Sequence, residues 1–297
     1  MKSRRSSKKL MKKISYRQFK KIELKYKKQI LDLALAESSK LIVDFLKEFD
    51  HILLKYGDEI IMIKKGTDAM NELHYSFYVT SKKELEKLVD QAIILSQTAK
   101  AEGFKNYFEA VIPRFNSISE LSEPLKLMFG GGFSNDIRKI IEAQRIKEGF
   151  DLSKSLWKYT KDSQKQIWST IYDGLQNNKT LSQIKKDISQ FLTAEGKQNL
   201  NYNVKRLYVT EVNNAYLRGA EYVTKTTDFV KEIHIFRNPN GDPTCEICNE
   251  LAGPVGGEGK TVDKDNAELP LYHPNCLCDY VDVLPTADDF IDYLHGG

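Results

Sequence analysis

Apolar residues recur at helical spacing along most of the chain, and this pattern predicts a mainly helical body. From Ile30 to Tyr56 they return every three or four positions, as on the buried face of a helix, and Gly57 follows the last of them. A second segment opens with Ser-Lys-Lys-Glu at Ser81. This is a capping-box pattern, and it predicts a helix that begins there and runs toward Phe108.

Breaks in the pattern divide the body. Pro113 closes the second segment, and three consecutive glycines from Gly130 interrupt the chain before another helical pattern from Asp136 to Lys147. The region 113–135 is therefore a possible boundary within the body.

The helical signal is strongest between residues 163 and 225. A first helix surrounds Ile167 and ends at the pair Asn177-Asn178, which is typical of a turn. Thr180 is expected to cap the next helix, and a third helix runs from about Asn203 to Lys225. The apolar faces of these helices are expected to form the core of the body.

Near residue 226 the pattern changes from helix to strand. From Phe229 to Arg237 the chain is rich in β-branched and aromatic residues, and Ile233 and Ile235 alternate with polar positions. The sequence therefore predicts an α+β fold. A helical body, residues 30–225, is followed by a small β-rich module, residues 226–297, that ends in a short helix.

Charge is distributed unevenly along the chain. Of its 45 basic and 41 acidic residues, thirteen basic residues and one acid, Glu23, lie within residues 1–28. The remaining 32 basic and 40 acidic residues give residues 29–297 a net charge of −8. Like charges at this density repel, so we expect residues 1–29 to be an extended basic arm that contacts an anionic partner such as double-stranded DNA, without sequence specificity. The alternative is a solvated tail. The candidate contact residues are Arg4, Arg5, Lys8, Lys9, Lys12 and Lys13.

The overall composition is that of a folded globular protein, with 41% hydrophobic and 29% charged residues. No apolar run approaches the roughly 20 residues that a membrane-spanning helix needs. The basic N-terminus is not followed by the apolar stretch of a secretory signal. We therefore expect no membrane partner and a location in the cytoplasm of the producing cell.

All four cysteines lie close together near the C-terminus. Cys245 and Cys248 form a Cys-x-x-Cys pair, and Cys276 and Cys278 follow His273 in the segment His-Pro-Asn-Cys-Leu-Cys. Zinc favours four tetrahedral ligands drawn from thiolates and imidazoles, so the module is predicted to hold a structural zinc ion. Five residues compete for four positions. In an extended segment Cys276 and Cys278 point to the same side and can both bind, but a site that includes His273 is preferred.

Other interpretations of this segment fit less well. A reducing cytoplasm and the strain of a Cys-x-Cys bridge disfavour disulfides. A catalytic zinc ion needs an open coordination position, whereas these thiolates are numerous enough to close the site. The glycine-rich stretch before Lys260 is not a phosphate-binding loop, because Pro254 stands where the first glycine of that motif is required.

Taken in order, the features from about Ile167 to Cys278 resemble the phage head morphogenesis family. These are the minor head proteins of tailed bacteriophages, including proteins similar to the minor head protein of phage Mu. The segments that carry the resemblance are Thr-Leu-Ser-Gln-Ile at Thr180–Ile184, a helix with Val-Thr-Glu and Asn-x-Ala at Val204–Tyr216, the Asp-x-x-Cys-x-x-Cys and Leu-x-Gly elements at Gly241–Gly253, and the ending His-Pro-x-Cys-x-Cys.

The resemblance implies a structural role without catalysis. Such a protein acts in procapsid assembly and lies in the capsid interior of the virion, associated with the portal vertex, with capsid or scaffold proteins and with packaged DNA. It is assembled in the cytoplasm of the bacterial host. Two other classes compete with this hypothesis. One is a zinc-dependent enzyme, either a nuclease or a toxin-like protein, and the other is a zinc-containing DNA-binding protein.

Overall fold

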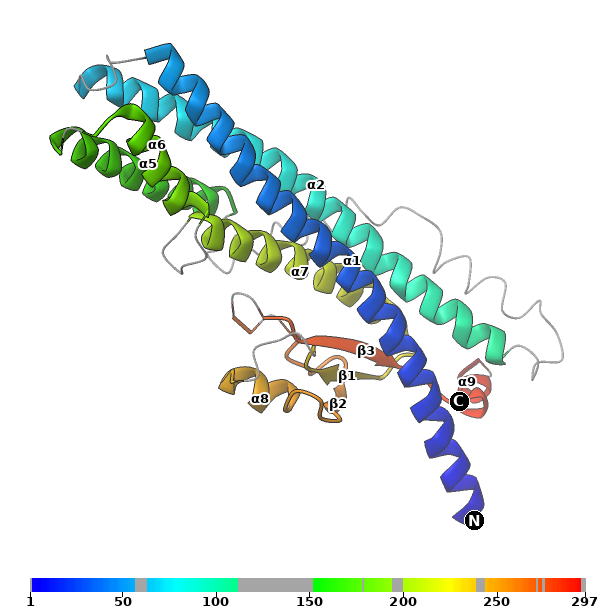
Figure 1. Cartoon of the computed structure of the whole chain (residues 1–297). Coiled ribbons are helices and arrows are strands. Elements are labelled where there is room, and N and C mark those ends of the chain that lie inside the picture. The colour runs from blue at the N-terminus through cyan, green and yellow to red at the C-terminus, as the bar shows by residue number, and fades with distance from the viewer. Residues whose placement is uncertain are drawn as a thin grey trace. The chain divides into compact units, whose positions relative to one another are not determined.

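The computed structural model describes residues 2–56, 63–111, 152–177, 179–193, 200–238, 244–270, 272–273 and 276–294. Helices dominate, and the strands lie near the C-terminus (Figure 1). The elements in chain order are α1 (Lys2–Tyr56), α2 (Ile63–Val111), α5 (Leu152–Gln176), α6 (Leu181–Thr193), α7 (Leu200–Thr226), β1 (Glu232–Phe236), α8 (Glu246–Ala252), β2 (Lys260–Asp263), β3 (Asp279–Val283) and α9 (Ala287–Leu294).

The chain forms two compact units that are interleaved along the sequence. The first, here called the mixed unit, comprises Met1–Ile30, Val89–Ile141 and Asn213–Gly297. The second, the helical unit, comprises Leu31–Leu88 and Glu142–Val212. The expected change near residue 226 lies between α7 and β1. However, the unit that contains the sheet also includes parts of α1, α2 and α7.

Apolar residues at helical spacing form the core of the helical unit. Phe45 of α1 and Phe77 of α2 meet edge to face with ring centroids 4.6 Å apart. Ile52 and Leu73 are also buried. The predicted helix from Ile30 to Tyr56 is confirmed as part of α1, because its apolar stripe faces this core.

The predicted helix start at Ser81 is wrong. Ser81 lies in the interior of α2 and is fully buried, and its carbonyl oxygen accepts a 3.0 Å hydrogen bond from the hydroxyl of Tyr208. The turns before it carry the buried residues Met70, Leu73 and Phe77. Burial of this apolar face extends the helix toward its N-terminus, so Ser81 has no capping role.

The junction between α5 and α6 follows the sequence prediction. The hydroxyl of Thr180 accepts a 3.3 Å hydrogen bond from the backbone N–H of Gln183, whose side-chain oxygen accepts a 2.8 Å bond from the N–H of Thr180. This reciprocal pair is a capping box, and α6 begins at the next residue. The predicted N-cap is therefore confirmed.

The mixed unit contains an antiparallel sheet in the order β2-β1-β3 (Figure 1). The predicted strand after Phe229 is confirmed as β1, which is the central strand. Ile233 lies opposite Val262 of β2 and Asp282 of β3. Ile233 and Ile235 are buried on one face of the strand, as their alternation predicts.

Aromatic side chains dominate a buried cluster in the mixed unit. Phe229 lies between Phe104 of α2 and Phe290 of α9, at centroid distances of 5.7 and 5.1 Å. The short C-terminal helix α9 is capped by Thr286, whose hydroxyl accepts a 3.2 Å bond from the N–H of Asp289. The predicted terminal helix is therefore confirmed, and packing of Phe290 fixes it to the unit.

The N-terminal segment differs from the expected extended arm. The chain is helical from Lys2, and the last part of the predicted arm is packed into the mixed unit. Phe19, Ile22 and Ile30 recur at helical spacing and are buried, and Lys27 is buried with them. Burial of these residues stabilises a helix that charge repulsion alone would disfavour.

Several expected features of the body lie at or beyond the limits of the described residues. Helix α2 is described as far as Val111, and the predicted break at Pro113 lies outside the described residues. The glycine triplet from Gly130, the boundary at 113–135 and the helix from Asp136 to Lys147 fall outside the residues that the structure describes.

Candidate metal centre

The Cys-x-x-Cys pair lies at the start of α8. Cys245 occupies the position before the first helical residue, and its carbonyl oxygen accepts a 3.0 Å hydrogen bond from the N–H of Asn249. Cys248 is one turn further on and points into the core. Gly253 ends the helix with φ of 83°, a conformation that favours glycine. The turn before α8 and the first turn of the helix therefore bring both sulfur atoms to the same end of α8.

The other candidate ligands lie on the segment that leads into β3. The N–H of Cys276 donates a 3.0 Å hydrogen bond to the carbonyl oxygen of His273, which closes a turn. Cys278 directly precedes Asp279, the first residue of β3. Because β3 pairs with β1 along its whole length, the strand fixes where this segment ends.

The structure brings all five predicted ligands together. The Nε2 atom of His273 lies 3.1 Å from the sulfur of Cys245 and 3.0 Å from the sulfur of Cys248. The sulfur of Cys248 lies 3.8 Å from that of Cys276. The five residues form two groups with ligand atoms within 4.8 Å of one another, Cys245 with Cys248 and His273, and Cys248 with Cys276 and Cys278. Cys248 belongs to both groups.

This cluster is largely removed from solvent. Cys248, Cys276 and Cys278 are 3%, 1% and 2% exposed, and they pack with Ile233 and Ile235 of β1. Burial raises the pKa of the Cys248 thiol to about 12, and the pKa of Cys278 is raised by its hydrogen bond to Cys276 and by burial. Thiolates are thus costly here unless a cation compensates their charge.

One of the distances within the cluster matches a tetrahedral metal ion, and two others are close to it. Two thiolates at about 2.3 Å from a tetrahedral zinc ion are separated by about 3.8 Å, which is the observed distance from Cys248 to Cys276. A thiolate and an imidazole on the same ion lie about 3.5 Å apart. The observed sulfur to nitrogen distances from His273 are shorter, 3.0 and 3.1 Å, so a small outward movement of the imidazole would admit the ion. The cluster can therefore hold a metal ion, and its donors are of the kind that zinc prefers.

The loop around Gly259, which lies in sequence between the Cys245–Cys248 pair and His273, is held by residues of β1 and β2. Gly259 has φ of 76°, and a Cβ atom there would collide with the carbonyl oxygen of Ile235 and the ring of His234. The His234 ring is hydrogen-bonded to the hydroxyl of Thr261 at 2.8 Å and to the carbonyl oxygen of Glu258 at 2.5 Å. The loop thus supplies hydrogen-bond partners for both ring nitrogens of this histidine, and burial lowers its pKa.

Lysine 260 takes no part in a phosphate-binding loop. Its Nζ donates to the carbonyl oxygen of Glu250 in α8, and Lys260 begins strand β2 rather than a helix. The rejection of a phosphate-binding loop from the sequence agrees with this geometry, because such a loop leads into a helix N-terminus.

Two contacts to the cluster were not predicted. The side-chain amide of Asn213 in α7 donates a 2.7 Å hydrogen bond to the carbonyl oxygen of Cys276, and the Nζ of Lys27 in α1 donates a 2.9 Å bond to that of Cys278. Asn213 is the asparagine of the Asn-x-Ala element that contributes to the family resemblance, so the sequence had already singled out this residue. Lys27 was indistinguishable from the other lysines of the basic segment.

The predicted contact residues of the basic segment cannot be compared with this centre. Arg4, Arg5, Lys8, Lys9, Lys12 and Lys13 lie in the first turns of α1, and their side chains are outside the described part of the structure. Within the described residues, no helix has the length and apolar character that crossing a bilayer requires.

Comparisons with known protein families, with characterised proteins and with solved structures find no match to this chain.

Proposed function

We propose that the chain is a minor head protein of a tailed bacteriophage, a structural component without catalytic activity, whose C-terminal module is folded around a zinc ion. One observation carries the proposal. The Cys-x-x-Cys and His-Pro-x-Cys-x-Cys elements, on which the family resemblance depends, converge on one buried cluster. These elements are separated by a glycine-rich loop, and a metal ion that joins them would contribute to the module's stability.

Zinc is the metal that this donor set fits best. Thiolate and imidazole ligands favour zinc over magnesium or calcium, which prefer oxygen. We assign the ligands as Cys245, Cys248 and His273, which form one group, with Cys276 of the second group as the fourth ligand, because its sulfur lies 3.8 Å from that of Cys248. Cys278 is then a buried thiol beside the ion.

A structural ion agrees better with the cluster than a catalytic one. Three of the cysteines are almost fully buried, so a substrate would have little access to the ion. Among the described residues, neither group contains a carboxylate that would serve as a general base. Four protein ligands complete the tetrahedral shell and leave no open position.

The basic first turns of α1 support a second part of the proposal. Six cationic residues between Arg4 and Lys13 would contact the phosphates of packaged double-stranded DNA or an acidic face of the portal protein. Capsid and scaffold proteins are the other partners proposed for a protein of the virion interior.

Metal analysis and co-purification test the two parts separately. Protein expressed with zinc should contain about one zinc ion per chain, as the single site requires. Co-expression with the portal, capsid and scaffold proteins of the same genome should yield a complex on size-exclusion chromatography. Absence of zinc would contradict the metal centre, and absence of every complex would contradict the head assignment. Metal-dependent cleavage of DNA that is lost in a Cys248→Ser variant would instead favour a nuclease.

A further inference from the structure

The metal-ligand segment is held by side chains from two helices that are distant in sequence. Lys27 of α1 is 251 residues from Cys278, and Asn213 of α7 is 63 residues from Cys276. Both side chains are buried, and both donate to a backbone carbonyl oxygen of a cluster cysteine. These bonds fix the backbone of the segment rather than the sulfur atoms themselves.

Lys27 holds two consecutive residues of this segment. Besides its bond to the carbonyl oxygen of Cys278, its Nζ lies 3.1 Å from the carboxylate of Asp279, and both ionic side chains are at most 1% exposed. A buried ammonium group is tolerated only where charged and polar partners satisfy it. The position of the Lys27 side chain therefore depends on the backbone at Cys278 and Asp279. The position of that backbone likewise depends on Lys27.

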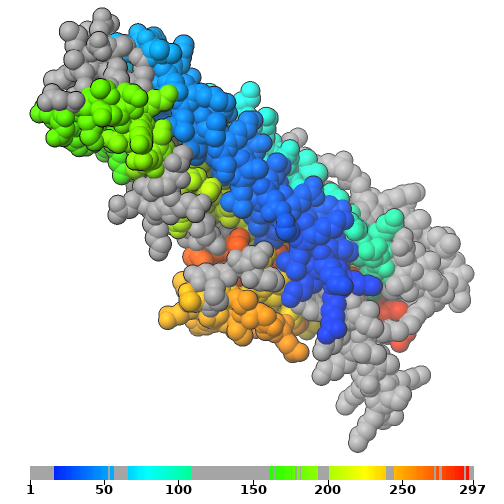
Figure 2. All heavy atoms as spheres, in the orientation of Figure 1, coloured from blue at the N-terminus to red at the C-terminus, as the bar shows by residue number. Residues whose placement is uncertain are grey.

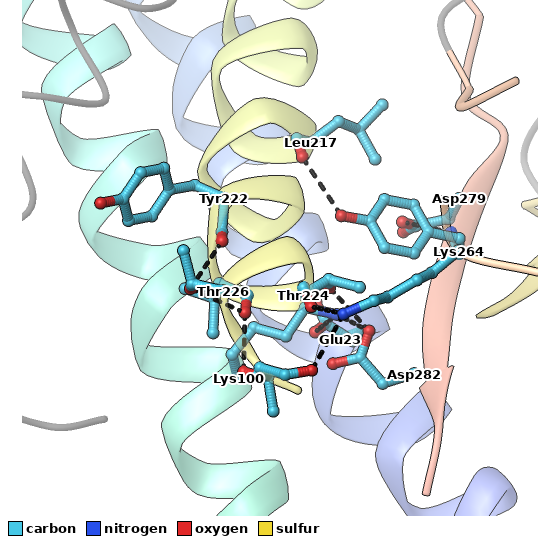
Figure 3. Close-up of polar contacts among 12 residues, drawn as sticks. Glu23, Lys100, Leu217, Tyr222, Thr224, Thr226, Lys264, Asp279 and Asp282 are labelled. Carbon is cyan, nitrogen blue, oxygen red and sulfur yellow. Dashed lines mark hydrogen bonds and ion pairs between the residues drawn. The ribbon is translucent and has the colours of Figure 1, made fainter. Parts of the chain in front are cut away.

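Strand β3, which begins at Asp279, is also linked to three helices by further buried charges (Figure 3). Lys100 of α2 lies 2.8 Å from Asp282 of β3 and 3.5 Å from Glu23 of α1, and the hydroxyl of Thr224 in α7 donates a 2.7 Å bond to Asp282. All three ionic side chains are at most 1% exposed. Figure 3 shows these groups converging from α1, α2, α7 and β3 on one buried site. This network joins residues 17–30 of α1 to the strand that follows the cluster.

We propose that Lys27 and Asn213 are positioning residues of the metal centre, and that zinc binding and the packing of residues 17–30 of α1 stabilise each other. The inference rests on the proposed zinc site and extends it beyond the C-terminal module. Zinc fixes the segment from His273 to Cys278 in the conformation in which its carbonyl oxygens accept from Lys27 and Asn213. Because the two effects are thermodynamically linked, they are equal in size. The packing of α1 and α7 increases the affinity for zinc by the same factor by which bound zinc favours that packing.

Zinc retention separates a positioning role from general stability. In competition with a chelator, Lys27→Met and Asn213→Asp should each weaken zinc binding about 10-fold to 100-fold, the usual cost of removing a residue that orients a metal ligand. Lys264→Met is the matched control. Lys264 is also a buried lysine that donates to backbone carbonyl oxygens, including a 3.0 Å bond to Thr227, but none of its acceptors belongs to the cluster. Its replacement should change zinc affinity less than about threefold.

Hydrogen exchange of the full chain, before and after zinc removal, tests the coupling directly. We expect residues 17–30 to lose protection together with residues 276–283, while residues 31–56 of the same helix change little. If the purified protein binds no zinc, the metal centre and this inference both fail. If it binds zinc, but residues 17–30 keep their protection after removal and Lys27→Met behaves like Lys264→Met, only the inference is overturned.

Discussion

The hydroxyl of Tyr216 in α7 donates a 2.7 Å hydrogen bond to the carboxylate of Glu23 in α1, and both side chains are at most 1% exposed. The carboxylate also lies 3.5 Å from the Nζ of Lys100. Burial raises the pKa of Glu23 to about 7, although Lys100 and the Tyr216 hydrogen bond oppose the shift and Asp279 and Asp282 add to it. Burial would lower the pKa of Lys100, but its carboxylate neighbours outweigh this effect and keep it a cation.

This relationship predicts a pH-dependent stability near neutrality. Because the pKa of Glu23 is about 7 in the folded state and 4.5 without its environment, the folded chain binds more protons between these values. Its contribution to stability is therefore largest at low pH and is lost as pH rises toward and through 7. A Glu23→Gln variant keeps an acceptor for Tyr216 and removes the titration. Relative to wild type, it should gain stability on the order of 2 kcal/mol between pH 5 and pH 8.5, measured by urea unfolding.

The control for this experiment is Asp162→Asn, which neutralises an exposed carboxylate in α5. Its stability difference from wild type should be nearly constant over the same pH range. A Glu23→Gln difference that is equally constant would show that Glu23 titrates as an ordinary carboxylate.

Replacement of the cysteines one at a time distinguishes the four ligands from the fifth candidate. Cys248→Ser and Cys276→Ser should abolish stoichiometric zinc binding, because Cys248 belongs to both groups and Cys276 lies 3.8 Å from it. Cys278→Ser should retain zinc, with stability reduced by its altered burial. Cobalt substitution provides the readout, since its visible spectrum reports the number of thiolate ligands. Loss of zinc in Cys278→Ser with retention in His273→Ala would replace our assignment with a four-cysteine site.

Two glycines in the loop before β2 provide a matched pair. Gly259 and Gly256 have φ of 76° and 77°, but a Cβ atom at Gly259 would collide with the backbone of Ile235, whereas nothing lies within 4 Å of one at Gly256. Gly256→Ala should therefore cost only the backbone penalty, about 1 kcal/mol. Gly259→Ala adds the collision and should cost about 3 kcal/mol or more. Thermal unfolding of the zinc-loaded protein measures both, and equal costs would contradict the close approach at Gly259.

The basic first turns of α1 predict a salt-dependent interaction with DNA. If the six candidate cations contact phosphates, changing all of them to Gln should reduce the slope of log K against log salt by about 5. The control changes six exposed lysines of the helical unit to Gln, and this variant has the same net charge. The lysines are Lys40, Lys47, Lys83, Lys87, Lys185 and Lys186. Equal slopes for the two variants would mean that α1 holds no DNA site.

Part of the fold was predictable because its signals are local. The cap at Thr180 requires only that Gln183 follow three residues later, and the strand around Ile233 requires only alternation. The capping-box pattern at Ser81 is equally local, yet the helix start that it predicted was wrong. Burial of Phe77 and its neighbours continues the helix through that position, and only contacts from other segments supply that burial.

The sequence by itself determined which residues can bind a metal, because thiolate and imidazole chemistry belongs to the residue types and Cys-x-x-Cys spacing is local. It also determined the helical body and the change to strand near residue 226. Only the tertiary structure decided that Lys27, one of thirteen similar cations, is buried against Asp279 and the carbonyl oxygen of Cys278. That partnership joins residues 251 positions apart, and charge spacing along a chain holds no information about such a distant acceptor. The candidate metal centre is therefore local in its ligands and non-local in the side chains that hold its backbone.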